Sequence, residues 1–200
     1  VGSLVLTGGL TLVAMLTLIV TNAYLMAILH DSAAGNDRIV NWPDTLFLTW
    51  ATDAFFLITA IAVPFILAWT LMYPLGGLLA GGWVILIPIY WLLFPIVLLS
   101  TLEMQSPLVP VSPVVIQSLR YCGRTWGVFY LQTALIGVVV LSMAFGFHVV
   151  GFMNLVGVAI LGGAATFASM LYVRLLGRVA WVCDERFREL RAQEEEEEDE

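Results

Sequence analysis

The chain has 200 residues, of which 60% are hydrophobic and only 12% are charged, and its formal net charge is −7. Soluble domains are about 45–50% apolar and about 25% charged, so this composition argues against a water-soluble fold and for one solvated by lipid. Seven of the acids form the terminal run 194–200, and the rest of the chain carries eight arginines and eight acids. A neutral body of this kind gives no sign of a nucleic-acid partner.

Three stretches without Arg, Asp, Glu or Lys contain the expected membrane spans. A helical span needs about 20 apolar residues, so stretch 1–30 predicts one span. Stretches 54–102 and 125–173 would each be about 74 Å long as one helix, against a hydrocarbon core of about 30 Å, so each must fold back as a hairpin. We therefore predict an all-α polytopic transmembrane helical bundle, a single span followed by a pair of hairpins. The spans are expected at about 4–29, 55–73, 78–102, 125–146 and 151–173.

Turn residues place the two hairpin tips. Pro74 and Gly76 mark the first tip, and Gly146 and Gly151 mark the second. The polar segment 30–54 precedes the first hairpin. Its second half has an amphipathic pattern that predicts an interfacial helix beginning at Thr45, with Asp44 as N-cap and Trp42 at headgroup level.

The segment before the second hairpin predicts a short helix. Ser112 and Pro113 have the character of an N-cap and a first helical position, and Gly123 is expected to close the helix after Cys122. After the last span, residues 174–192 predict an amphipathic helix that lies along the membrane surface, strengthened by an Asp184–Arg188 pair four residues apart. Residues 1–193 then form the transmembrane domain, and the self-repelling acidic tail 194–200 is expected to be disordered.

The arginines orient the predicted bundle. All eight fall in the three segments on one side of the membrane, namely Arg38, Arg120, Arg124, Arg174, Arg178, Arg186, Arg188 and Arg191. An excess of basic residues marks the cytoplasmic side, so the C-terminus is expected in the cytoplasm and the protein in a bacterial cytoplasmic membrane. Because the chain starts at Val1 rather than Met, we expect it to belong to a longer chain.

Few residues in the predicted spans indicate transport or catalysis. No charged side chain lies inside a predicted span, and intramembrane charges are what mark ion pathways and proton relays. The uncharged polar groups, Asn22, Thr133 and Asn154 among them, are expected to make hydrogen bonds between helices. A stripe of small residues on the last span is expected to pack within the chain, and it comprises Ala159, Gly162, Gly163, Thr166 and Ser169.

The sequence contains no recognisable catalytic, cofactor-binding or metal-binding constellation. Cys122 and Cys183 lie far apart and form no Cys-x-x-Cys pair, which argues against a disulfide framework, a zinc site or a dithiol redox motif. His148 lies at a predicted hairpin tip with no second ligand nearby in sequence. We therefore expect no cofactor and no enzymatic activity.

Short motifs give the chain a resemblance. They are Ala33-Ala34-Gly35-Asn36-Asp37 followed by Trp42-Pro43-Asp44, then Phe94-Pro95 with Leu99-Ser100, and Arg174-Leu175-Leu176-Gly177-Arg178. In these the chain resembles uncharacterised bacterial multi-pass membrane proteins grouped as domains of unknown function, although Asn36 stands where an acid is expected. The resemblance implies a multi-spanning membrane domain and assigns no activity to any residue.

The function expected from these patterns is that of a membrane scaffold or interaction domain of a larger chain. Its partners would be the lipid bilayer and other membrane-protein subunits. The alternative is a permease-type transporter subunit that moves a small solute or lipid without intramembrane charge coupling, and an intramembrane enzyme comes third. Binding residues concentrate on loops held by a rigid scaffold. The candidate interaction loop therefore runs from Gly35 to Asp44, with Asp37, Arg38, Trp42 and Asp44 as its candidate residues.

Overall fold

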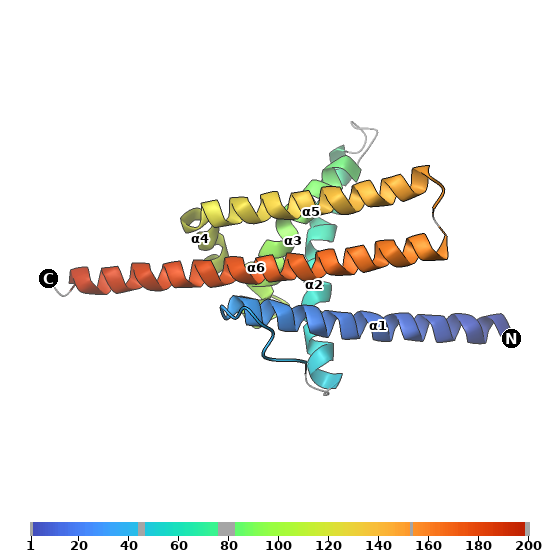
Figure 1. Cartoon of the computed structure of the whole chain (residues 1–200). Helices are drawn as coiled ribbons and strands as arrows, with labels where there is room; N and C mark the ends of the chain where they lie inside the picture. The colour runs from blue at the N-terminus through green and yellow to red at the C-terminus, as the bar shows by residue number, and fades with distance from the viewer. Residues whose placement is uncertain (1, 44–46, 76–82, 153, 199–200) are drawn as a thin grey trace. The chain divides into compact units, whose positions relative to one another are not determined.

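A computed structural model of the chain describes residues 2–43, 47–75, 83–152 and 154–198, and within these ranges it contains helices and no strand (Figure 1). The helices are α1 (Gly2–Ala33), α2 (Phe47–Leu75), α3 (Trp83–Glu103), α4 (Pro113–Tyr121), α5 (Gly123–Val149) and α6 (Leu155–Glu198). All except α4 are long and apolar enough to cross a membrane. The predicted all-α fold with five candidate spans is therefore confirmed.

Helix α2 begins earlier than the span predicted for it. It starts at Phe47, so the expected interfacial helix is the first part of α2 and not a separate element. No Gly or Pro lies between Phe47 and Phe55, and helical hydrogen bonding therefore continues without a break. Asp44, Thr45 and Gly76, on which a predicted cap and a predicted turn rest, lie outside the described residues.

The short helix α4 begins at Pro113 as predicted, but its ends differ from expectation. The Ser112 hydroxyl is buried and has no hydrogen-bond partner, so Ser112 does not cap the helix with its side chain. Its backbone carbonyl instead accepts the Ile116 N–H at 3.1 Å. Gly123 does not close α4, because it is the first residue of α5.

Helix α6 is one continuous element of 44 residues, about 66 Å long at 1.5 Å per residue (Figure 1). The helix predicted at 174–192 is therefore the continuation of the last span. Residues 194–198, which were predicted to be disordered, are helical. Glu is a good helix former, and the preceding turns are joined by ion pairs of Arg186 with Glu189 at 2.8 Å and of Arg188 with Asp184 at 2.6 Å.

The chain forms two compact units, and the first comprises Val1–Met26 and Trp42–Gln117. Within it α2 packs against α3. Ala60, Pro64 and Ala68 recur every four residues along α2 and are all buried, so they form the packed stripe of that helix. The large apolar side chains on its other faces, such as Phe55 and Ile58, are more than half exposed, as expected for a surface that lipid covers.

The second unit comprises Ala27–Asn41 and Ser118–Glu200, and its main feature is the hairpin of α5 and α6. Gly151 makes the turn with φ of +72°, in the left-handed region that favours glycine. The Asn154 side chain accepts the Gly157 N–H at 2.9 Å and so caps α6. This bond is local, which corrects the prediction that Asn154 would bond to another helix.

The core of the second unit lies at the end of the hairpin away from this turn. Trp126 and Phe129 of α5 are buried there, with Leu176 and Val179 of α6. The Phe129 and Tyr172 rings make a T-shaped contact with centroids 5.4 Å apart. The Trp126 indole N–H donates to the Ser118 hydroxyl at 3.1 Å, which satisfies its polar atom inside the core.

Toward the turn, the small-residue stripe of α6 is exposed. A Cβ added at Gly162 or Gly163 would meet nothing within 4 Å, and the Thr166 and Ser169 hydroxyls bond to carbonyls of their own helix. The prediction that this small-residue stripe packs within the chain was therefore wrong for the described residues. The Thr133 hydroxyl bonds to the Phe129 carbonyl of its own helix at 3.0 Å.

Candidate functional site

The candidate site begins where α1 ends. The Gly35 N–H donates to the Ser32 carbonyl at 3.2 Å and the Asn36 N–H to the Asp31 carbonyl at 2.9 Å, which is the Schellman pattern of a helix C-terminus. This pattern needs a left-handed residue after the last turn, and Gly35 supplies it with φ of +80°. The chain therefore leaves α1 in a fixed direction.

Asp31 then holds the far end of the loop. Its carboxylate is buried and accepts the Val40 N–H at 2.7 Å, the Asn41 N–H at 3.0 Å and the Asn41 side-chain amide at 2.8 Å. An acid in the last turn of a helix is disfavoured by the helix dipole, so these three donors are what stabilise it there. The loop 34–41 is thus closed on itself by one carboxylate.

Helix α6 holds the middle of the same loop. Arg174 donates to the Asp37 backbone carbonyl at 2.8 Å, and Arg178 forms an ion pair with the Asp37 carboxylate. The Arg178 guanidinium also lies over the Trp181 ring, 5.5 Å from its centroid, in a cation–π contact. Three residues on successive turns of α6 therefore fix the loop from one side.

Two glycines allow this close approach. A Cβ at Gly35 would lie 2.7 Å from the Trp181 indole nitrogen, and a Cβ at Gly177 would lie 2.5 Å from the Ser32 Cβ and 2.7 Å from the Leu29 carbonyl oxygen. All three distances are shorter than real Cβ atoms show. The contact between α6 and the end of α1 is therefore built at backbone distance, and we call the set Asp31, Gly35, Asp37, Arg174, Gly177, Arg178 and Trp181 the loop clamp.

Asp31→Ala should release the loop. The change removes the acceptor of two backbone N–H groups, and hydrogen bonds to charged groups contribute about 1.5–3 kcal/mol each. We expect amide exchange at Val40 and Asn41 to accelerate by about tenfold or more, measured by hydrogen–deuterium exchange of the protein in nanodiscs. Asp184→Ala is the control, since its exposed pair with Arg188 touches no part of the loop. Unchanged exchange at both amides in Asp31→Ala would contradict the role given to Asp31.

The four residues predicted for the interaction loop have different outcomes. Asp37 is part of the loop clamp and its side chain is nevertheless 82% exposed. Arg38 lies beside it in the loop and is also exposed. Trp42 belongs to the first unit, where its ring makes a T-shaped contact with Tyr24 at 6.1 Å, and Asp44 lies outside the described residues. The structure thus brings one of the four into the clamp.

Sequence reasoning missed most of the clamp. Asp31 was read as part of a polar loop and is in the last turn of α1. One signal was available, because an acid placed just before a helix-ending glycine needs donors of its own. Gly177 appeared only within the short motif 174–178, to which no role was assigned, and Trp181 had no signal, since the loop residues that they contact lie more than 140 positions away in the chain.

The two cysteines, which are far apart in the sequence, are neighbours in the fold. Cys122 precedes α5 and Cys183 lies on α6, and both are buried free thiols. The Cys183 thiol is in hydrogen-bonding contact with the Cys122 thiol and the Ser118 hydroxyl. Antiparallel packing of α5 on α6 brings them together, and no local motif encodes that pairing. Among the described residues no group of three His, Cys, Asp or Glu side chains is placed to hold a metal ion.

No family model, curated protein or solved structure matches the chain. The resemblance to multi-pass membrane proteins of unknown function therefore stays a prediction that rests on the short motifs alone. The loop clamp contains residues of two of those motifs, namely Gly35 and Asp37 of the first and Arg174, Gly177 and Arg178 of the last.

Proposed function

We propose that this chain is a membrane scaffold or interaction module that presents the loop 34–41 to a partner subunit on the cytoplasmic side of a bacterial membrane. The arginines support the orientation. All eight belong to the second unit. Those on the hairpin are Arg124 at the start of α5 and the five arginines of α6 from Arg174 onward, away from the turn at Gly151. A basic excess at one membrane face is typical of the cytoplasmic side.

The observation that carries the proposal is a loop ordered before any partner arrives. Its two ends are joined by Asp31 and its middle is held by Arg174 and Arg178. A loop fixed in this way loses little conformational entropy on binding, which is the main cost of using a loop for recognition. The exposed Asp37 and Arg38 side chains are then polar contacts presented in a constant geometry.

A second candidate, a permease-type subunit, has one observation in its favour. Asn22 of α1 is 4% exposed, and both polar atoms of its amide have no hydrogen-bond partner. A buried amide at membrane depth is costly unless a polar group reaches it. A polar solute passing through the first unit would supply that group, as would a polar side chain of a neighbouring subunit.

The test uses charge reversal in the loop. Arg38→Glu should lower the yield of a partner subunit copurified from membranes by about tenfold, which corresponds to about 1.4 kcal/mol, while the melting temperature is unchanged. Arg191→Glu is the matched control, an exposed arginine on α6 outside the loop clamp, and should leave the yield unchanged. Equal yields from Arg38→Glu, Asp37→Asn and the unmodified protein would overturn the scaffold proposal and favour the permease.

A further inference from the structure

An uncharged segment connects α3 to the arginines that precede α5. Residues 104–119 contain no Arg, Lys, His, Asp or Glu. A soluble stretch of that length has about four charged residues, because about 25% of the residues in soluble domains are charged. Exposed apolar side chains take their place, and they include Met104, Leu108, Val111, Val114 and Ile116. Leu108 is 84% exposed, and apolar side chains exposed next to one another mark an interaction surface.

The start of α4 has its serines buried and two of its apolar side chains exposed. Ser112 is 0% exposed and Ser118 is 6% exposed, and Val115 is buried between them. Val114 and Ile116 are instead 41% and 49% exposed. A short helix covered by water normally has the opposite arrangement, with its polar face outside. Serines inside and aliphatic side chains outside are the arrangement expected where the surroundings are apolar.

The lengths of the helices keep this segment at one membrane surface. With 21 residues, α3 is about 32 Å long, so it crosses a hydrocarbon core of about 30 Å and ends with Glu103 at the boundary of the core. With nine residues, α4 is about 14 Å long and too short to cross back. Irregular backbone exposed to lipid does not cross the core either. The chain therefore stays at the face where α3 ends until α5 begins.

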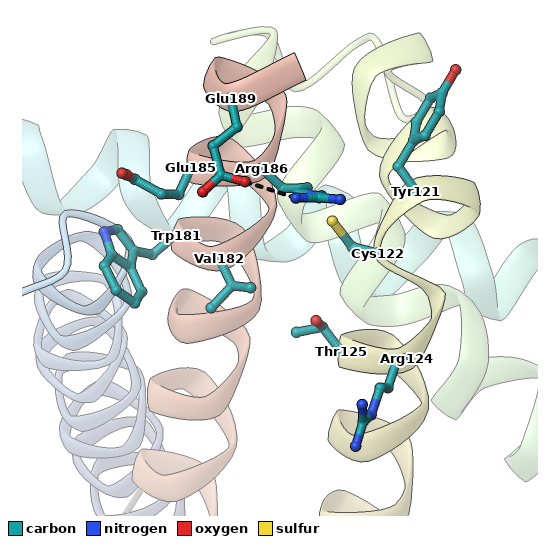
Figure 2. Close-up of a pocket in the computed structure, with 9 residues that line it drawn as sticks. All are labelled: Tyr121, Cys122, Arg124, Thr125, Trp181, Val182, Glu185, Arg186 and Glu189. Atoms are coloured by element: carbon teal, nitrogen blue, oxygen red, sulfur yellow. Dashed lines mark hydrogen bonds and ion pairs between the residues drawn. The ribbon is translucent and has the colours of Figure 1, made fainter. Parts of the chain in front are cut away.

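The far end of the segment lies at headgroup depth. With 27 residues, α5 is about 40 Å long, and a bilayer including its headgroups is about 40–45 Å thick, so the first turn of α5 reaches the headgroup layer. A groove of about 320 Å³ lies there, between the start of α5 and the second half of α6 (Figure 2). The residues that line it include Tyr121, Cys122, Arg124, Trp181, Glu185 and Arg186. Tyr121 is the last residue of α4, and tyrosine and tryptophan are the side chains enriched at this depth.

The backbone of the irregular part leaves few N–H groups to be satisfied from outside. The N–H groups that donate to backbone carbonyls include those of Met104, Gln105, Ser106 and Val109. The residues that have no N–H are Pro107, Pro110 and Pro113. The main cost of placing irregular backbone among lipids, which is that of bare donors, is therefore small here.

We propose that residues 104–116 insert into the headgroup–acyl boundary of the bilayer at this face, and that α4 rises out of it toward Arg120. Lipid as the occupant accounts at once for the missing charges, the exposed apolar side chains and the buried serines. The inserted surface continues that of α3 and α5, whose exposed apolar side chains lipid also covers. The direction of α4 follows from its exposed residues, because Val114 and Ile116 come first and the polar Gln117 and Arg120 follow.

The test is the collision of nitroxide spin labels with oxygen and with a polar nickel chelate, measured on the full chain in nanodiscs. In a background carrying Cys122→Ala and Cys183→Ala, labels on Leu108→Cys and Ile116→Cys should collide more with oxygen, which dissolves in lipid. Their ratio of oxygen to nickel collisions should exceed that of Gln193→Cys by about tenfold, which corresponds to about 1.4 kcal/mol for excluding the polar chelate.

Two further labels calibrate the depth. Leu131→Cys, on an exposed position of α5, should give the high ratio of a membrane span, and Arg120→Cys should lie between Leu108→Cys and Gln193→Cys. All five labelled positions are exposed, so the labels displace no packed side chain. Circular dichroism of each labelled protein checks that its helix content equals that of the unlabelled background.

Each of the other outcomes would overturn the proposal. Ratios at Leu108→Cys and Ile116→Cys equal to that of Gln193→Cys would mean that water covers the segment. Few collisions with either reagent would mean that protein covers it, in a second copy or a partner subunit. A ratio at Arg120→Cys as high as at Leu108→Cys would contradict the rise of α4. The measurement does not depend on which face is cytoplasmic, so its outcome is independent of the proposed function.

Discussion

Gly177→Ala should destabilise the protein, against the ordinary effect of this substitution in a helix. An alanine in an open helical position is more stable than glycine by about 1 kcal/mol. At Gly177 the added Cβ would lie 2.7 Å from the Leu29 carbonyl oxygen and 3.0 Å from the Ala33 nitrogen. These are backbone atoms of α1 that cannot rotate away. The end of α1 and α6 must therefore separate, at a cost of about 1–3 kcal/mol.

Gly163→Ala supplies the matched control on the same helix. A Cβ there meets nothing within 4 Å, so the melting temperature should stay the same or rise. For a protein of this size a change of 1 kcal/mol moves the melting temperature by about 2–4 °C, and the two variants should therefore move in opposite directions. Shifts of the same sign in detergent-solubilised protein would contradict the close approach of α6 to α1.

Cysteines introduced at the two ends of the α5–α6 hairpin should differ completely in their accessibility to a reagent outside the cell. The native thiols cannot report this, because Cys122 and Cys183 are both buried. In a background carrying Cys122→Ala and Cys183→Ala, His148→Cys places an exposed thiol near the turn and Gln193→Cys places one near the end of α6. A membrane-impermeant maleimide applied to intact cells should label the first fully and the second not at all.

Permeabilised cells provide the control, since both thiols should then react. Labelling of Gln193→Cys alone in intact cells would reverse the orientation that the arginines predict. Labelling of both in intact cells would mean that the hairpin does not cross the membrane.

Much of the helical architecture was predictable because lipid imposes it. Stretches without charge had to be helices, and their length relative to the bilayer set how many there are. Helix boundaries were less predictable where nothing breaks the backbone: α2 absorbs the expected interfacial helix, and α6 runs on to Glu198. Apolar periodicity marks which faces are buried, and it does not mark where one helix continues into the next.

The candidate site was predictable only in part, because its contacts join distant segments. Asp37 could be named from its place in a polar loop, but its partner Arg178 lies 141 positions further along the chain. The Cys122–Cys183 contact has the same origin in the antiparallel packing of α5 and α6. Local patterns cannot specify such pairs. The contact of α6 with the loop also depends on Gly35 and Gly177, which only the folded chain shows to be necessary.

Trp181 contacts both the loop and the groove. Its indole lies against Gly35 on one side, and the same ring lines the cavity beside Arg124 and Glu185. A ligand that occupies the cavity and restricts the Trp181 ring must therefore also change the free energy of the ordered loop. Linkage makes the effect reciprocal, since a partner that holds the loop changes the affinity of the groove by the same factor. One aromatic side chain thus makes the occupancy of the cavity and the order of the loop thermodynamically coupled variables.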